Sequence, residues 1–184
     1  MKLTSEQIVQ NWERLLNVIE TEFTGERKDK LLSMYKDLEE RMCMAPASSF
    51  SHYHNCMPGG YVDHVLRVIE CAQEVYDLWT RMGADMSGYT KEELIFVALN
   101  HDIGKMGFPG EGNEIYQPND SEWHRKNLGK EYKINPNNPF TLVNDLSIWL
   151  LQHYGIEITW NEMLGIKLTD GLYDESNKPY YISR

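Results

Sequence analysis

Apolar residues recur every three or four positions along most of the chain, the spacing that gathers them on one face of an α-helix. The first such segment begins at the capping-box sequence Thr4-Ser5-Glu6-Gln7 and continues to about Glu22. A second helix is expected from Glu26 to Met42. Residues 45–60, rich in Pro, Ser and Gly, then predict a structured loop.

The same pattern continues through the rest of the chain. We expect a long amphipathic helix from Val62 to about Trp79 and a shorter, more apolar one from Lys91 to about Asp102. Two further helical segments are expected at residues 140–153 and 160–171. Strand-like alternation is nearly absent, so the prediction is an all-α fold, a compact helical bundle forming one domain over residues 1–184.

Two connections in this scheme are long. The Gly- and Pro-rich residues 104–118 exceed a simple helix connection and are typical of a lid or a substrate-binding segment. Residues 133–139 predict a loop within the domain rather than a domain boundary.

The overall charge narrows the class of partner. The chain has 18 basic and 28 acidic residues and a formal net charge of −10. This balance argues against long duplex nucleic acid and leaves small anionic substrates, held by a local site, as the expected partners.

Cysteine content and hydropathy predict the cellular compartment of the protein. Three cysteines without paired metal-ligand spacing, together with the absence of a signal-like N-terminus, favour a reducing, cytoplasmic compartment. No apolar run approaches the roughly 18 to 20 residues that a membrane span needs, so no membrane association is expected.

Ionisable residues fall on or beside the apolar stripes of several predicted helices, namely His64, His101, Asp102, His153 and Asp170. One such histidine alone would most often be a core residue bonded to a backbone carbonyl. Burying several ionisable groups together is costly without a partner, and a cation would be such a partner. Imidazole nitrogen and carboxylate oxygen are ligands that suit iron, manganese and zinc.

Two sequence motifs give these residues a family context. "GGYVDHVLRV" followed later by "NHDIGK" resembles the HD superfamily of metal-dependent phosphohydrolases, whose pattern is a first His, a His-Asp doublet and a distal Asp. The resemblance implies His64, His101 and Asp102 as metal ligands. It implies Asp170 as the distal ligand, with Asp174 as the competing choice.

The resemblance covers residues 45–172 and implies a compact HD-domain bundle. Residues 1–42 are then two additional N-terminal helices, and residues 173–184 a C-terminal tail. The approach "APASSFSHYHNCMPGGYVDH" is similar to that in small phage and bacterial HD proteins and in the HD domain of bacterial 3′→5′ exoribonucleases. A histidine pair commonly precedes the Gly-Gly in these proteins, and here the pair is reduced to His54-Asn55.

Two more histidines extend the match. With His124 and His153 included, the ligand order is similar to the two-metal branch of the superfamily, in which Asp102 would bridge the metals. The resemblance therefore implies one or two divalent transition metals, such as iron or manganese. A solvated surface histidine explains His124 equally well, because it lies in a polar stretch.

The implied activity is hydrolysis of a phosphoester or phosphoanhydride bond, in a nucleotide or short oligonucleotide, by a metal-activated water. Asp102, Lys105 and His54 are the expected catalytic residues: Asp102 as metal ligand, Lys105 to stabilise phosphoryl charge, and His54 as phosphate contact or proton donor. Lys105, Arg125 and Lys126 are the expected phosphate contacts. For Arg125 and Lys126, an ordinary solvated surface is the alternative.

The sequence is also compatible with two other functions. The six-ligand order also resembles di-iron oxygenases that share the fold. A non-catalytic nucleotide-binding module, signalling or forming a homo-oligomer through residues 1–42, is the third hypothesis. Tyr61, Tyr116 and Trp123 are candidates for stacking on a base, with core packing as the alternative for each.

Overall fold

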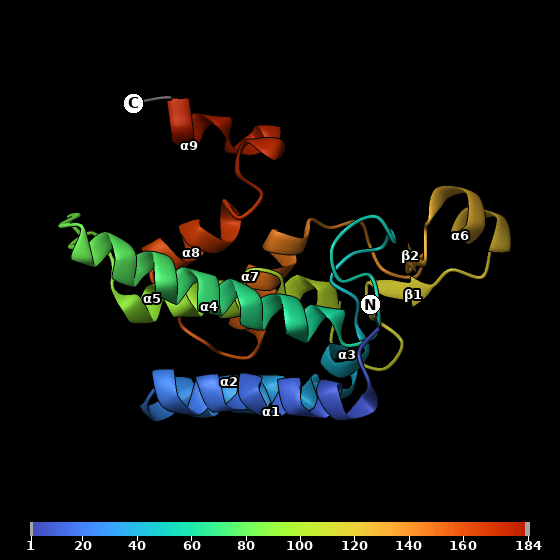
Figure 1. Cartoon of the computed structure of the whole chain (residues 1–184), viewed down its shortest axis with the longest axis horizontal. Coiled ribbons are helices and arrows are strands. Elements are labelled where there is room, and N and C mark those ends of the chain that lie inside the picture. The colour runs from blue at the N-terminus through green and yellow to red at the C-terminus, as the bar shows by residue number, and fades with distance from the viewer. Residues whose placement is uncertain (1, 183–184) are drawn as a thin grey trace.

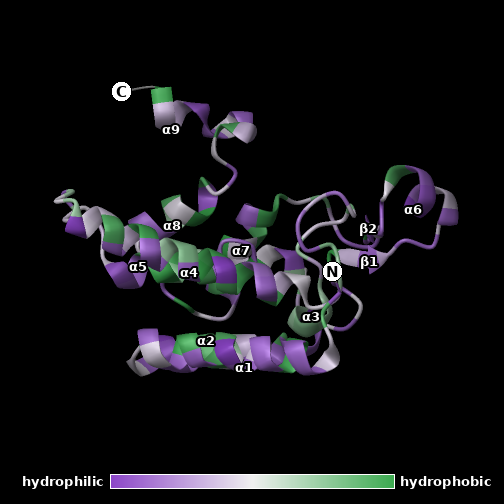
Figure 2. Ribbon diagram, in the orientation of Figure 1, coloured by the Kyte–Doolittle hydropathy of each residue, from purple (hydrophilic) through white to green (hydrophobic). Residues whose placement is uncertain are grey.

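A computed structural model describes residues 2–182 (Figure 1). This part of the chain is mostly helical, with one small sheet, which confirms the predicted all-α fold. Figure 2 shows hydrophobic and hydrophilic residues on the same helices, for example on the long helix α4, Gly60–Arg81. No helix in residues 2–182 is both long and apolar enough to cross a membrane.

The N-terminal helices form a layer along one side of the molecule (Figure 1). Helix α1 spans Ser5–Glu22 and begins at the capping box formed by Thr4 and Gln7. Helix α2 spans Gly25–Asp37 and is followed by the short α3, Glu39–Met44. The single helix expected from Glu26 to Met42 was therefore wrong, because the backbone leaves the helical conformation at the buried Leu38 and the chain turns toward α4.

The central layer packs around α5, Lys91–Asn100, and α7, Val143–His153. Helix α5 packs against both α4 and α8, Trp160–Lys167. Helix α7 packs against the 3₁₀ turn η1, Ile103–Met106, and against α8. The largest fully buried side chains come from both layers and include Leu15, Leu31, Tyr35, Tyr61, Phe96 and Leu99.

A small sheet departs from the prediction. Strands β1, Tyr116–Pro118, and β2, Tyr132–Ile134, pair antiparallel with Gln117 opposite Lys133, and α6, Glu122–Leu128, lies between them. The expected loop at residues 133–139 thus begins inside a strand. Strands of three residues are too short to show an alternating pattern in sequence.

The last helical segment also ends earlier than expected. Helix α8 stops at Lys167, and the 3₁₀ turns η2, Gly171–Tyr173, and η3, Glu175–Asn177, lead into α9, Lys178–Ile182. In Figure 1 this C-terminal segment projects away from the helical body.

A buried ion pair joins the two layers. The Arg27 guanidinium on α2 lies 2.5 Å from the Glu162 carboxylate on α8, whose side chain is 0% exposed. Arg27 also pairs with Glu92 at 3.2 Å, and its guanidinium carbon lies 4.0 Å from the ring centre of Phe96. The layers are therefore held by charge as well as by apolar packing.

We expect Arg27→Ala to lower the free energy of unfolding by about 3–5 kcal/mol, because it leaves the Glu162 carboxylate buried without its cation. Urea unfolding followed by circular dichroism measures the loss. Arg14→Ala is the matched control, since the Arg14 and Glu70 side chains are each 57% exposed and such pairs contribute up to about 1 kcal/mol. Equal losses in the two variants would contradict the assignment.

Candidate metal centre

The start of α4 is shaped by two glycines. Gly59 has a φ of +77°, which favours glycine. A Cβ atom on Gly60 would lie 2.1 Å from the Asn55 carbonyl oxygen. The loop before α4 therefore crosses close over the helix start, and His64 follows one turn later.

The His-Asp doublet lies where α5 ends. His101 is the C-cap of α5, and its backbone N–H donates to the Val97 carbonyl oxygen at 2.8 Å. The His101 ring is buried, and its Nδ1 lies 2.8 Å from the Ala98 carbonyl oxygen. Asp102 comes directly before η1 and leaves the helical conformation.

Three side chains converge at this point. The Nε2 atoms of His64 and His101 are 3.2 Å apart, and each lies 3.4 Å from Oδ2 of Asp102. These ligand atoms lie within 4.8 Å of one another, close enough for all three to hold one metal ion. Residues predicted as ligands from separate motifs are thus brought together by α4 and α5.

The donor chemistry fits a divalent transition metal. A carbonyl oxygen only accepts hydrogen bonds, so Nδ1 of His101 carries a proton toward Ala98, and Nε2 is the ring nitrogen that faces the cluster and would bind a metal. A backbone carbonyl that fixes the histidine tautomer in this way is typical of metal sites. Two imidazoles and one carboxylate suit iron, manganese or zinc.

Lys105 is the immediate neighbour of the Asp102 carboxylate. Its ammonium lies 2.5 Å from Oδ2 and also donates to the Ala47 carbonyl oxygen at 2.7 Å. Burial would raise the pKa of Asp102, but hydrogen bonds from His101 and His64 and the charge of Lys105 hold that pKa well below its usual range. Asp102 is therefore ionised and able to bind a cation.

His54 faces the cluster from the loop before α4. Its ring centre lies 4.6 Å from that of His64. Burial lowers the pKa of His54, and the nearby His64 and Lys105 lower it further. The hydroxyl of Ser48 donates to the His54 carbonyl oxygen at 2.7 Å and holds the loop at this point.

A pocket of about 470 Å³ opens over the cluster. His54 and Lys105 line it beside the three ligands, and Asp170 also contributes to its wall. Asp170 is exposed and lies outside the group of three ligand atoms. Asp174, the competing distal residue, instead accepts a hydrogen bond from the Ser176 N–H at the start of η3.

The two additional histidines lie elsewhere. His124 is exposed on α6 beside Trp123. His153 is exposed at the end of α7, where its ring stacks on Trp149 at 5.0 Å. The structure does not bring either of them to the cluster, so the expected six-ligand arrangement does not form in residues 2–182.

The inward position expected for His153 was wrong because the stripe was placed on the wrong side of α7. The stripe that the sequence pattern predicts for His153 consists of Leu142, Leu146 and Trp149. Leu146 is 2% exposed, but Leu142 and Trp149 are 40% and 42% exposed. The face of α7 that is buried consists of Asn144, Leu146, Ser147, Leu150 and Leu151.

The expected phosphate contacts separate in the structure. Lys105 lies at the cluster, as described above. Lys126 is exposed on α6 and pairs with Glu122 at 2.5 Å. Arg125 donates to the Asn119 carbonyl oxygen and lines a different pocket.

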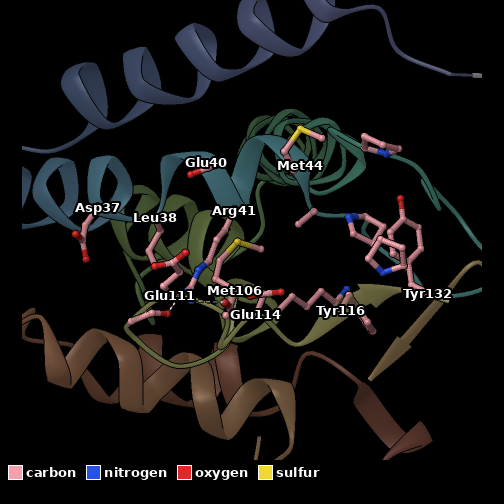
Figure 3. Close-up of a pocket in the computed structure, with 17 residues that line it drawn as sticks. Asp37, Leu38, Glu40, Arg41, Met44, Met106, Glu111, Glu114, Tyr116 and Tyr132 are labelled. Carbon is pink, nitrogen blue, oxygen red and sulfur yellow. Dashed lines mark hydrogen bonds between the residues drawn. The ribbon is translucent and has the colours of Figure 1, made fainter. Parts of the chain in front are cut away.

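A larger pocket, of about 740 Å³, lies between α3, the loop after η1 and the small sheet (Figure 3). Lys105 belongs to the walls of both this pocket and the pocket over the cluster, so the two adjoin. Tyr116 and Tyr132 line its sheet end in Figure 3. Of the other aromatic residues considered for stacking, Tyr61 is fully buried and Trp123 is exposed on α6.

Arg41 fixes one wall of this larger pocket. Its guanidinium donates to the carbonyl oxygens of Met106 at 3.0 Å and Phe108 at 2.7 Å, and also to that of Gly110. Sequence reasoning missed Arg41, because an arginine near a helix end carries no motif that would distinguish it.

Comparison of the chain with protein-family models, with curated proteins and with solved structures gives no match. The resemblance to the HD superfamily therefore depends on the motif residues alone.

We expect the protein to bind a divalent transition metal and His101→Ala to weaken that binding at least about 100-fold, because a ligand atom is lost. Isothermal titration with manganese, supported by elemental analysis, measures the affinity. His153→Ala removes an exposed histidine outside the cluster and should leave the affinity unchanged. Equal affinity in the His101 variant and the unmodified protein would rule out the assigned centre.

Proposed function

We propose that the protein is an HD-type metal-dependent phosphohydrolase that cleaves a phosphoester or phosphoanhydride bond in a nucleotide or short oligonucleotide. The observation that carries this proposal is the convergence of His64, His101 and Asp102 with the Lys105 ammonium beside them. The cluster supplies metal ligands, and Lys105 supplies a positive charge at the edge of an open pocket.

In this proposal, His64, His101 and Asp102 hold a divalent cation such as manganese or iron. Asp170, in the wall of the same pocket, is the candidate distal ligand. When bound, the cation would supply Lewis acidity and lower the pKa of a coordinated water. The imidazole of His101 is oriented for this role by the Ala98 carbonyl.

Two residues act on the substrate. Lys105, held by Ala47 and Asp102, is positioned to neutralise negative charge on the phosphoryl oxygens. His54 faces the same pocket beside His64 and is positioned to contact the phosphate or to exchange a proton with it.

The positions of His124 and His153 help to decide between a phosphohydrolase and a di-iron oxygenase. Because His124 and His153 lie apart from the cluster, the described residues support one metal ion rather than two. This favours phosphate hydrolysis over the di-iron oxygenase alternative.

A small substrate suits both charge and shape. The net charge of −10 disfavours a long polyanion, whereas Lys105 gives local positive charge at the cluster. The adjoining pocket, with Tyr116 in its wall, has room for the organic part of a nucleotide. We also infer a reducing, cytoplasmic compartment, because Cys43, Cys56 and Cys71 are free thiols.

The first experiment is a chromatographic product screen. The manganese-loaded protein is incubated with ribonucleotides, deoxynucleotides, cyclic dinucleotides and short oligonucleotides, and the position of the cut identifies the bond. Absence of any product, combined with oxygen uptake by the iron-loaded protein, would replace the proposal with the oxygenase alternative.

We expect His101→Ala and Asp102→Asn to abolish hydrolysis, because each removes a metal ligand, while far-UV circular dichroism stays close to that of the unmodified protein. His124→Ala, which changes an exposed histidine, serves as the control and should retain full turnover. Normal turnover in either cluster variant would refute the proposed centre.

We expect Lys105→Gln to lower kcat about 100- to 1,000-fold and to change KM less, since its charge matters most when negative charge develops on the phosphoryl group. Steady-state kinetics with the substrate found in the screen separates the two constants. A change confined to KM would assign Lys105 to ground-state binding instead.

A further inference from the structure

A third pocket, of about 730 Å³, carries positive charge on an acidic protein. Arg67 of α4, Arg125 of α6 and Lys2 contribute cations to its wall, and among its described lining residues Glu131 is the only carboxylate. We call it the Arg67–Arg125 pocket. In a chain of net charge −10, such a local excess of positive charge selects an anionic group.

This pocket adjoins the metal centre along two short segments of chain. On the loop before α4, His54 lines the pocket over the cluster, whereas the next residue, Asn55, lines the Arg67–Arg125 pocket. On α4, Val68 lines the first pocket and Arg67 the second. Adjacent residues of the same loop and of the same helix therefore line the two pockets.

The Arg67 side chain is held by one ion pair and still has hydrogen-bond donors available to a ligand. Its guanidinium pairs with Asp63, which also accepts a hydrogen bond from the Asn55 side-chain amide at 2.8 Å. The Arg67 side chain is nevertheless 66% exposed. A guanidinium has five N–H donors, so several remain for a ligand.

Arg125 approaches from a different element. Its guanidinium donates to the Asn119 carbonyl oxygen, a neutral partner, and makes no ion pair with a carboxylate in residues 2–182. Each of these two guanidinium groups can form the bidentate pair of hydrogen bonds with which arginine binds phosphate.

The Arg67–Arg125 pocket shares part of its wall with the larger pocket of Figure 3, which we call the aromatic pocket. Tyr132, Pro58 and Pro118 line both that pocket and the Arg67–Arg125 pocket, and Lys105 connects the aromatic pocket to the metal centre. The three pockets are therefore consecutive neighbours around the loop before α4 and the small sheet.

We propose that the Arg67–Arg125 pocket binds a second phosphate group of the substrate, next to the phosphate that is cleaved at the metal centre. The substrate class is then a short oligonucleotide with more than one phosphate rather than a nucleoside monophosphate. This inference rests on the proposed function of the metal centre. Hydrolysis adds water across one P–O bond, with the hydroxyl going to phosphorus and the proton to the leaving oxygen.

The test uses the dinucleotide TpT and its 5′- and 3′-phosphorylated forms, pTpT and TpTp. With the manganese-loaded protein, kcat/KM is expected to be at least about tenfold higher for one phosphorylated form than for TpT, because charge-assisted hydrogen bonds to phosphate are added. In Arg67→Ala and in Arg125→Ala, this ratio should fall toward one. Arg67→Gln and Arg125→Gln keep side-chain bulk and should show the same fall.

Arg81→Ala is the matched control, since Arg81 is an exposed cation of α4 outside the pocket, and it should keep the ratio of the unmodified protein. A ratio that is near one in the unmodified protein, or unchanged in both arginine variants, would overturn the second phosphate site.

A separate measurement distinguishes this failure from failure of the metal centre. If none of the three dinucleotides is hydrolysed, titration calorimetry compares the binding of TpT, pTpT and TpTp to the full chain. Tighter binding of a phosphorylated form that is lost in Arg67→Ala supports the pocket without catalysis. Equal binding of all three overturns it.

Discussion

The ionised carboxylate of Asp102 is the constraint around which the centre of this protein is arranged. A buried carboxylate is stable only when its charge is compensated, and here the compensation comes from three directions. His64 arrives from α4, His101 from the end of α5, and Lys105 from η1. Since Lys105 also holds the Ala47 carbonyl, the loop before α4 is tied to the same charge.

Hydrogen bonds to α7 also hold the backbone around His101 and Asp102. The Gly104 N–H donates to the Ser147 hydroxyl of α7 at 2.8 Å, and that hydroxyl lies 3.2 Å from the His101 carbonyl oxygen. A Cβ atom on Gly104 would lie 2.1 Å from the Val143 carbonyl oxygen. Glycine after the doublet is therefore required by the close approach of α7, and the position of Asp102 depends on that approach.

Much of the fold was predictable because helical periodicity is a strong local signal. The sequence also predicted that His64, His101 and Asp102 would meet, because the resemblance to the HD superfamily implies these three ligands and the apolar faces of their helices agree with it. The break at Leu38 and the three-residue strands were not predictable, since both depend on contacts distant in sequence. His153 was placed on the wrong face of α7, because an apolar stripe inferred from a few residues does not fix the orientation of a helix about its axis.

Through Arg41, the N-terminal layer helps to hold the loop after η1 in place. The residues that resemble the HD superfamily begin at about 45, yet the loop carrying Met106, Phe108 and Gly110 is held by a side chain that precedes them. Arg27 likewise neutralises a carboxylate that lies deep within the resembling region. A fragment cut at the boundary of the resemblance would therefore be an incomplete folding unit, lacking part of the wall of the larger pocket.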